Sequence, residues 1–437
     1  MNFFEKIFRF GIIAIGLIVE VIIVRNLFLF FTEHFVWIEM VLRLFSILLV
    51  MYIINNSRHL SADMLWVLLI ILFPIPGTAL FLLLGANLII SKTFLELIKN
   101  TVESKKYFVQ DKIVLEEVEE IAPHMKGDFY YLSKTEGYPI YRNSNFDYYA
   151  LGDLGYPVML EEMKKAESFI FLEYFTIEKG KLWECMHTIL KEKVTQGLDV
   201  RVMYDDMETI HSLPPNYANM LESEGIKCVR YNKINPFLGV VMNHRDHRKI
   251  MVIDGKVAFS GGMNLADEYI NQKMVFGHWK DNVIRVKGEA VWSYTVLFLV
   301  NWNAIRKTDD DYTVFKVDAK MENTDGYISP YGETPFDGEN TGQNVYMNIL
   351  NRANNYVYIC TPYLIIDTEL ENALILAAKR GVDVRIITPG IPDKKMVWNI
   401  TRSFYQNLID GGVKIYEYTP GFIHGKVFVS DDIVATV

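Results

Sequence analysis

The sequence predicts N-terminal transmembrane helices followed by an α/β region, which is built from two repeated α/β sandwich units with the active site between them. Three observations support this fold class. Apolar residues dominate the first 90 positions of the 437-residue chain. From about Asp128, short apolar strands alternate with amphipathic helices. One strand and helix pattern then occurs twice in the same order, which indicates a duplicated unit.

Three apolar segments near the N-terminus are predicted to span a membrane. Residues 64–85 form an uncharged run of 22 residues. Such a run can cross a hydrocarbon core of about 30 Å, and a buried core helix is the alternative. Residues 35–54 contain Glu39 and Arg43, whose spacing suits an ion pair on one helix face. Residues 10–31 lack a small-residue cleavage site, which favours an anchor over a removable signal peptide.

Composition narrows the function classes. The first 90 residues carry five basic and five acidic side chains, so the net charge of −9 belongs to the remainder. An acidic region is a poor partner for nucleic acid, whose binding depends on phosphate neutralisation. The three cysteines are widely separated and show no metal-ligand spacing. No nucleotide-binding motif is evident either, so we expect neither a metal nor another cofactor.

An internal repeat organises the α/β region. Residues 197–202 (GLDVRV) recur as 381–386 (GVDVRI), each after a predicted helix and at the start of a strand. A further helix, glycine and strand step follows in both copies, at 225–228 and 412–415. Because the matching elements occur in the same order, the simplest architecture is two facing copies of one unit.

These patterns divide the chain into a transmembrane anchor over 1–90, a linker with helix over 91–127, a first unit over 128–320 and a second unit over 321–437. Basic residues closely follow the last predicted span: Lys92, Lys99, Lys105 and Lys106. Positive flanking charge favours the cytoplasmic side of a membrane. We therefore expect the catalytic region to lie in the cytoplasm.

Each unit contains one His-x-Lys-x-x-x-x-Asp motif. The motif residues are His247, Lys249 and Asp254 in the first unit and His424, Lys426 and Asp431 in the second. Alternate residues of a strand face the same side, so each histidine and lysine can reach one ligand. Imidazole is a nucleophile with a pKa near neutral pH, a second imidazole can protonate a leaving alkoxide, and lysine can hold phosphoryl oxygens. A lone histidine of this kind is usually a core residue, but two matched motifs favour phosphodiester chemistry.

The paired motifs resemble those of the phospholipase D superfamily, and longer stretches resemble bacterial cardiolipin synthases. The similar stretches are FLEYF at 171–175, HRDHRK at 244–249, FGHWKD at 276–281 and TPYL at 361–364. The resemblance covers essentially the whole chain, including its apolar N-terminus. It implies two phospholipase D-like units in a multi-pass protein of the bacterial cell membrane, with phosphatidylglycerol as substrate.

The reaction that the resemblance implies is transfer of a phosphatidyl group between two phosphatidylglycerol molecules, which gives cardiolipin and glycerol through a phosphohistidine intermediate. His247 would then be the nucleophile and His424 the acid, although the sequence does not fix this order. The residues expected to hold the phosphate or support the site are Lys249, Lys426, Asn264 and Asp281. The motif aspartates would be structural. A phospholipase D-type hydrolase and a catalytically impaired membrane protein remain alternatives.

The sequence departs from the family pattern in two places. The family follows its first motif with Gly-Ser-x-Asn, whereas this chain has GGMN at 261–264, so Gly262 replaces the hydroxyl. The sequence stops six residues after Asp431, before the matching stretch of the second unit would begin. We therefore expect a second unit that is incomplete at its C-terminus, with Asp431 on a frayed end and an open strand edge at 427–429.

Overall fold

The computed structural model of the protein describes residues 18–26, 29, 36–57, 60–85, 92–233, 245–309, 311–319, 321, 324, 326–334 and 338–437. The chain divides into two compact units. One unit combines residues 1–91 with 233–245, and the other combines 92–232 with 246–437. The predicted span over 10–31 falls largely outside the described residues.

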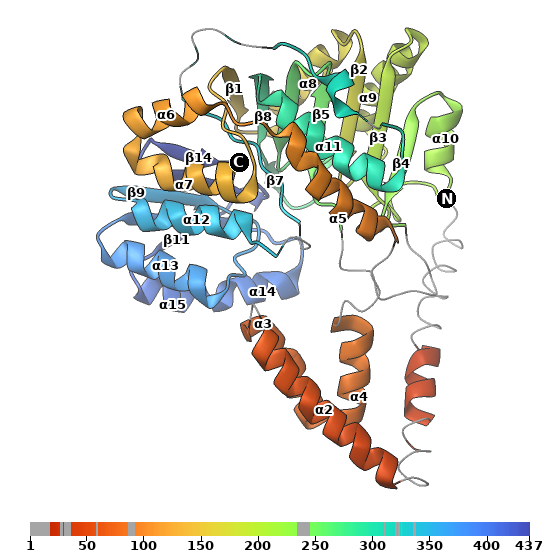
Figure 1. Ribbon diagram of the computed structural model, residues 1–437, viewed down its shortest axis with the longest axis vertical. Helices are drawn as coiled ribbons and strands as arrows, with labels where there is room; N and C mark the ends of the chain where they lie inside the picture. The colour runs from red at the N-terminus through yellow and green to blue at the C-terminus, as the bar shows by residue number, and fades with distance from the viewer. Residues whose placement is uncertain are drawn as a thin grey trace. The chain divides into compact units, whose positions relative to one another are not determined.

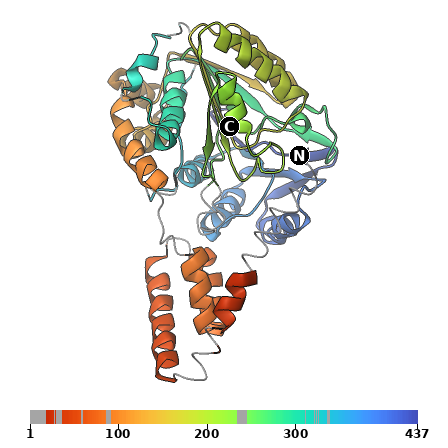
Figure 2. The same ribbon diagram turned by 90° about the vertical axis from the view of Figure 1, so that its right-hand side faces the viewer.

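The N-terminal unit is helical (Figures 1 and 2). Its labelled helices are α2 (Val36–Asn56), α3 (Leu60–Leu72) and α4 (Pro74–Leu80), and a short π-helix (Phe81–Gly85) follows. Within the described part of the chain, one helix is long and apolar enough to cross a membrane, over Glu39–Asn56 in α2. It lies within the predicted span at 35–54, apart from its last two residues, and its Arg43 pairs with Glu39 at 2.7 Å as the spacing suggests.

The apolar run over 64–85 is not the continuous helix that the sequence analysis predicted. Phe73 leaves the helical region, with φ −132° and ψ 74°, because a proline disfavours helical geometry in the residue before it. α3 has 13 residues, which makes it about 20 Å long and shorter than a hydrocarbon core of about 30 Å. α4 packs closely on α3, since a Cβ on Gly77 would lie 2.5 Å from the carbonyl oxygen of Leu69.

Polar contacts from α2 stabilise this helix break. The hydroxyl of Ser46 donates to the carbonyl oxygen of Pro74 at 2.7 Å, and Thr78 Oγ1 donates to Ser46 Oγ at 2.8 Å. In apolar surroundings an unpartnered carbonyl is costly, so breaks of this kind persist where side chains supply partners. Membrane crossing by α2 and by the other predicted spans stays a prediction.

The second unit contains two mixed sheets covered by helices (Figure 1). The larger sheet has the strand order β1-β8-β6-β5-β2-β3-β4. Its strands are β1 (Ser144–Tyr149), β2 (Phe169–Tyr174), β3 (Asp199–Asp205), β4 (Lys227–Tyr231), β5 (Lys249–Ile253), β6 (Val257–Gly261) and β8 (Val283–Gly288). The helices of this half are α8 (Gly152–Lys164), α9 (Lys181–Thr195), α10 (Tyr217–Ser223) and α11 (Val291–Ile305).

Helices cover both faces of the larger sheet, which explains the uninterrupted apolar run in β2. Ile170 belongs to a core shared with α8 and α9. On the other face, Phe171 stacks on Phe298 of α11 with ring centroids 4.7 Å apart. The segment predicted as a linker over 91–127 contains α5 (Lys92–Ser104) and α6 (Lys112–Ile121), and α7 (Lys126–Tyr130) begins at its end. Of these, α5 lies along α11 (Figure 1).

The smaller sheet has the order β11-β10-β9-β13-β14. Its strands are β9 (Tyr356–Cys360), β10 (Asp383–Pro389), β11 (Lys414–Tyr418), β13 (Val427–Ser430) and β14 (Val434–Thr436). The helices of this half are α12 (Thr341–Arg352), α13 (Thr368–Lys379), α14 (Lys395–Ser403) and α15 (Tyr405–Asp410). A two-stranded parallel pair, β7 (His278–Lys280) with β12 (Gly421–Ile423), joins the two halves.

The two sheets share one topology, as expected from the internal repeat. Parallel strands β2, β3 and β4 are flanked by antiparallel β5, and β9, β10 and β11 are flanked in the same way by β13. The predicted open edge at 427–429 is wrong, because β14 pairs with β13 along it, placing Phe428 opposite Thr436. A turn after Asp431 reverses the chain and provides that covering strand.

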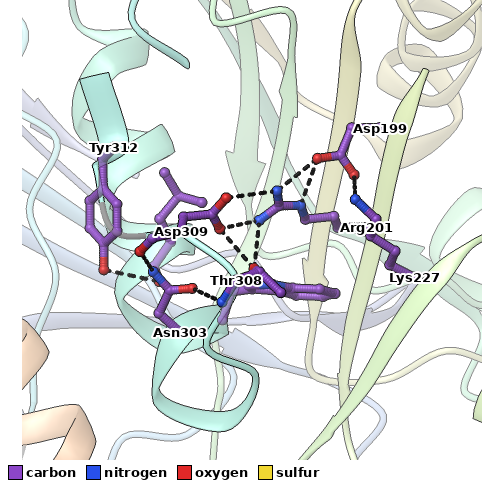
Figure 3. A network of polar contacts seen from close by, with 9 residues as sticks. Asp199, Arg201, Lys227, Asn303, Thr308, Asp309 and Tyr312 are labelled. Atoms are coloured by element: carbon purple, nitrogen blue, oxygen red, sulfur yellow. Dashed lines mark hydrogen bonds and ion pairs between the residues drawn. The ribbon is translucent and has the colours of Figure 1, made fainter. Parts of the chain in front are cut away.

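An arginine network in the first half, drawn in Figure 3, has a counterpart in the second half. Arg201 of β3 is 3% exposed and lies between Asp199, at 2.7 Å, and Asp309, at 2.5 Å. Lys227 of β4 pairs with Asp199 at 2.8 Å. The second half repeats these pairs with Asp383, Arg385 and Lys414. In the first half, the network ties β3 to the segment after α11 and so holds that helix on the sheet.

Candidate active site

The two aspartates of the motifs occupy equivalent turns. Asp254 and Asp431 have φ of 52° and 55°, a left-handed conformation that aspartate tolerates better than most residues. Each carboxylate accepts hydrogen bonds from three consecutive backbone N–H groups at the start of a neighbouring strand. The donors are Glu167, Ser168 and Phe169 for the first carboxylate, and Asn354, Asn355 and Tyr356 for the second.

These contacts correct the expectation that Asp431 lies on a frayed end. Burial raises the pKa of its carboxyl, but the three N–H donors outweigh burial and hold that pKa below its usual range. Asp254 therefore holds β5 against β2, and Asp431 holds β13 against β9. Each aspartate lies just after the end of its strand, β5 or β13, whereas the motif histidine lies before the start of that strand.

His247 and Lys249 lie at the start of β5, next to Phe175. The Phe175 ring meets the His247 ring edge-on at 4.6 Å between centroids, and Lys249 Nζ lies 5.1 Å from its centre. Lys249 also donates to the carbonyl oxygen of His247 at 2.6 Å. Partial burial and the charges of Lys249 and Lys426 lower the pKa of His247 well below its usual range, which keeps this imidazole neutral.

His424 follows β12 and meets a carboxylate from the other half of the unit. Its Nδ1 lies 2.6 Å from Asp281 Oδ2, and the Asp281 side chain is fully buried. Lys426 Nζ donates to the carbonyl oxygen of His424 at 2.7 Å and lies 2.9 Å from its Nε2. Burial and Lys426 lower the pKa of His424, and Asp281 opposes them by favouring the imidazolium.

The two motifs share one electrostatic environment. Burial lowers the pKa of Lys249 to about 7, with the charge of Lys426 as the next cause. Burial likewise lowers the pKa of Lys426 to about 8. Burial disfavours the charged forms of Lys249 and Lys426, and an anion bound between them would stabilise those charged forms. The arrangement is therefore suited to a phosphodiester.

Asn264 and Gly262 lie next to this site and contact protein groups around it. The Asn264 side chain accepts from the Thr176 N–H at 3.2 Å and donates to Tyr269 Oη at 2.8 Å, so both its polar ends have protein partners. A Cβ on Gly262 would lie 2.0 Å from Asp281 Oδ1. The absence of a side chain at Gly262 thus leaves room for the carboxylate that contacts His424.

Two buried acidic residues next to the first motif, Glu173 and Asp246, were not predicted as site residues. The side chain of Glu173 is fully buried, accepts from Asn301 Nδ2 at 2.6 Å and lies 3.9 Å from Arg248 Nη1. One oxygen of Glu173 and one of Asp246 are buried without a donor among the described residues. Burial and the adjacent Asp246 raise the pKa of Glu173 well above its usual range. We infer that Glu173 is protonated and shares this proton with Asp246. Both residues lie in stretches that carried the family resemblance, FLEYF and HRDHRK, but their pairing depends on the fold.

We expect Glu173→Gln to preserve activity, because its amide can donate to Asp246 as the shared proton does. Glu173→Ala should cost about 1–3 kcal/mol of folding free energy, since it leaves the Asn301 amide and the Asp246 carboxyl group without their buried partner. The raised pKa means that the native protein holds a proton that the unfolded chain releases. Stability should therefore fall as the pH rises from the ordinary glutamate pKa towards the native one, and glutamine should remove this slope.

Thermal unfolding of the three proteins between about pH 5 and pH 8 tests the shared proton. Equal pH slopes for the wild type and Glu173→Gln would contradict it. Glu167→Gln is the matched control, because the Glu167 side chain is 78% exposed.

A metal site is not formed by the described residues, in which no group of three or more His, Cys, Asp or Glu side chains is arranged to hold an ion. The chemistry available at the site is that of two imidazoles, two ammonium groups and one carboxylate. His247, Lys249, His424, Lys426 and Asp281 are brought together, whereas Asp254, Asp431 and Asn264 support them from outside.

Comparison with known proteins agrees with this arrangement. A family described as "Cardiolipin synthase, PLD-like domain" matches residues 159–289 and 346–437. An uncharacterized protein of Streptococcus mutans is 45% identical over 390 residues, covering 89% of this chain and 84% of its own. A cardiolipin synthase of Alkalihalophilus pseudofirmus is 31% identical over 388 residues, covering 87% and 76%. Among solved structures, a phosphatidylserine synthase of Haemophilus influenzae matches 66% of this chain and 76% of its own with 14% identity and a TM-score of 0.48. The chain belongs to the cardiolipin synthase family of phospholipase D-like proteins.

Proposed function

We propose that this protein is a phosphatidyltransferase that converts two phosphatidylglycerol molecules into cardiolipin and glycerol. The observation that supports the proposal is a site to which both halves contribute a histidine and a lysine. The first half also contributes Asp281, which contacts His424 of the second half at 2.6 Å. Relatives named cardiolipin synthases that align over most of the chain support the same activity.

In the first step, the neutral imidazole of His247 attacks the phosphorus of one phosphatidylglycerol. The bond from phosphorus to the headgroup glycerol oxygen breaks, and a P–N bond to His247 forms. Lys249 and Lys426 bind the phosphoryl oxygens as their charge rises. The phosphodiester anion favours protonated His424, which Asp281 also stabilises, so His424 can give its proton to the leaving glycerol.

In the second step, the headgroup hydroxyl of another phosphatidylglycerol attacks the same phosphorus. His424, now neutral, takes the hydroxyl proton, and the P–N bond to His247 breaks. Cardiolipin leaves with all groups restored. Each transfer breaks one phosphodiester bond and forms another of nearly equal energy. The reaction therefore needs no nucleotide as an energy source.

We propose a membrane location as well. The apolar helix α2 would anchor the protein in a bacterial membrane, with a further crossing at 10–31. The lysines that follow the apolar segments favour a cytoplasmic catalytic unit. Protease protection of the catalytic unit in intact cells, with cleavage after permeabilisation, is the result expected of that orientation.

The activity test is an incubation of the full chain in vesicles with headgroup-labelled phosphatidylglycerol. We expect cardiolipin and free glycerol in equal amounts, and the same rate with a divalent-metal chelator present. Phosphatidic acid as the main lipid product would instead indicate a hydrolase. Loss of turnover on chelation, restored by a divalent ion, would contradict catalysis by the histidines and lysines alone.

A further inference from the structure

Two methionines next to the catalytic strands are unusually exposed. Met274 is 85% exposed and Met396 is 76% exposed, the two highest values for large hydrophobic side chains among the described residues. They exceed Leu65 of the apolar N-terminal unit, at 73%. Met274 lies in the loop before β7, and Met396 lies at the start of α14. Exposed apolar side chains that form one contiguous patch are characteristic of a surface that meets a partner.

Both methionine-bearing segments pack against β12, the strand that leads into His424. Gly277, which ends the first segment, forms a backbone bridge with Gly421 of β12. Ile391, which opens the second segment, donates its N–H to the carbonyl oxygen of Gly421 at 3.1 Å. The Ile391 side chain also lies beside Gly277, because a Cβ there would be 3.0 Å from Ile391 Cδ1. The two segments are therefore neighbours at the edge of the active site.

The bases of both segments are fixed while their tips are exposed. Phe276 packs on Phe422 of β12, with ring centroids 6.2 Å apart. Tyr363 packs on the same Phe422 ring at 6.4 Å, and its hydroxyl donates to Asp393 at 2.5 Å. Anchored bases make the exposure of Met274 and Met396 a feature of the fold.

Positive charge accompanies these apolar tips. Lys394 and Lys395 precede Met396, and within the described ranges Lys395 forms no ion pair. The charge of Lys394 contributes to lowering the pKa of His247, which places this side chain near the proposed nucleophile. Apolar side chains beside lysines suit a surface of anionic lipid, where the former enter the acyl region and the latter meet the headgroups.

We infer that Met274, Val275, Ile391, Lys394, Lys395 and Met396 form a lipid-docking rim, which inserts into an anionic bilayer surface beside the active site. The inference rests on the proposed function for its substrate, a phospholipid that remains in the bilayer. Drawing such a lipid wholly into water would expose both acyl chains, which is strongly unfavourable. A rim that enters the headgroup layer allows the phosphodiester to reach the site while the chains stay in lipid.

The test compares two forms of phosphatidylglycerol with the full chain: long-chain lipid in phosphatidylglycerol and phosphatidylcholine vesicles, and short-chain lipid dispersed as monomers. The variant Met274→Glu with Met396→Glu should lose about tenfold or more of its vesicle turnover, since charge at two inserted positions opposes docking. Its turnover of the short-chain lipid should stay within about twofold of the wild type. Met274→Leu with Met396→Leu should keep vesicle turnover, because leucine is equally apolar.

Val314→Glu is the matched control, because Val314 is 71% exposed but lies in a short 3₁₀ helix, Tyr312–Phe315, away from β12. It should keep turnover of both substrates. Full vesicle turnover by the double glutamate variant would overturn the inference, and so would an equal loss on both substrates. An equal vesicle defect in Val314→Glu would also overturn it, since any added surface charge would then suffice.

A label at position 274 tests docking without relying on catalysis. In a chain whose three native cysteines are replaced by alanine, a fluorophore on Met274→Cys should be quenched by nitroxide-bearing lipid in anionic vesicles. The same fluorophore on Val314→Cys should not be quenched. An unquenched label at position 274 would overturn the rim whether or not cardiolipin is formed, whereas quenching without cardiolipin formation would contradict only the proposed reaction.

Discussion

Replacing His247 by alanine is expected to abolish cardiolipin formation and the covalent phosphatidyl-enzyme together. The variant lacks the imidazole that forms the P–N bond, and Lys249, which donates to the backbone carbonyl of His247 at 2.6 Å, binds the phosphoryl oxygens in the proposed mechanism. His424→Ala should behave differently. It should still form the adduct, but release of glycerol should slow by about 10²–10⁴-fold, the usual contribution of a positioned acid.

Acid quenching after a brief incubation with acyl-labelled phosphatidylglycerol distinguishes these outcomes. Label should remain on the wild type and on His424→Ala but not on His247→Ala. The matched control is His187→Ala, which removes a histidine of α9 that pairs with Glu224 at 2.5 Å and belongs to neither motif. Label on His247→Ala and none on His424→Ala would reverse the two roles.

The repeat and the grouping of each motif histidine with its lysine could be predicted from the sequence because both depend on local patterns. The helix, glycine and strand junctions at 197–202 and 381–386 each determine their own conformation, and matching order then implies matching topology. Each histidine and lysine lie two residues apart at the start of a strand, so their common face follows from strand geometry alone.

Other features could not be predicted because they depend on contacts between distant residues. Asp281 follows β7 in the first half, yet it reaches His424 only because β7 pairs with β12 from the second. The proton shared by Glu173 and Asp246 requires two carboxyl groups that are 73 positions apart, 246 − 173, to be buried together. The β13 edge is covered only because a tight turn after Asp431 allows β14, Val434–Thr436, to pair with it.

Hydropathy alone does not reveal the helix break within the apolar run at 64–85. The run at 64–85 is uncharged and long enough for a span, but averaging over it hides the effect of Pro74 on Phe73. The backbone restriction that Pro74 imposes on Phe73 interrupts the helix despite the apolar pattern. At this break, Ser46 of α2 donates a hydrogen bond to the carbonyl oxygen of Pro74. Proline positions therefore need to be weighed residue by residue within an apolar run.

Replacing Asp281 by asparagine should lower kcat by about 10²–10⁴-fold with little change in KM, because the side chain acts on His424 and not on the substrate. In the wild type, Asp281 Oδ2 faces His424 Nδ1 at 2.6 Å, while Asp281 Oδ1 accepts from the Asn282 N–H at 2.8 Å. Asparagine can keep the second bond through its oxygen. Its NH₂ group would then face Nδ1, which favours the tautomer with an unprotonated Nδ1 and withdraws support from the imidazolium.

The pH dependence of the Asp281→Asn variant separates this role from loss of fold. Asp281 raises the pKa of His424 against burial and Lys426, so its neutral replacement should lower that pKa further. Protonated His424 is needed to release glycerol, and the alkaline limb of kcat should therefore move to lower pH. Asp147→Asn, which makes the same change on a carboxylate 50% exposed beside Arg285, should leave the profile unchanged. If Asp281 only holds the two halves together, its variant should lose activity with a lowered Tm, a raised KM and an unshifted alkaline limb. A broken β7–β12 junction would give that result, because it would affect binding and stability at every pH.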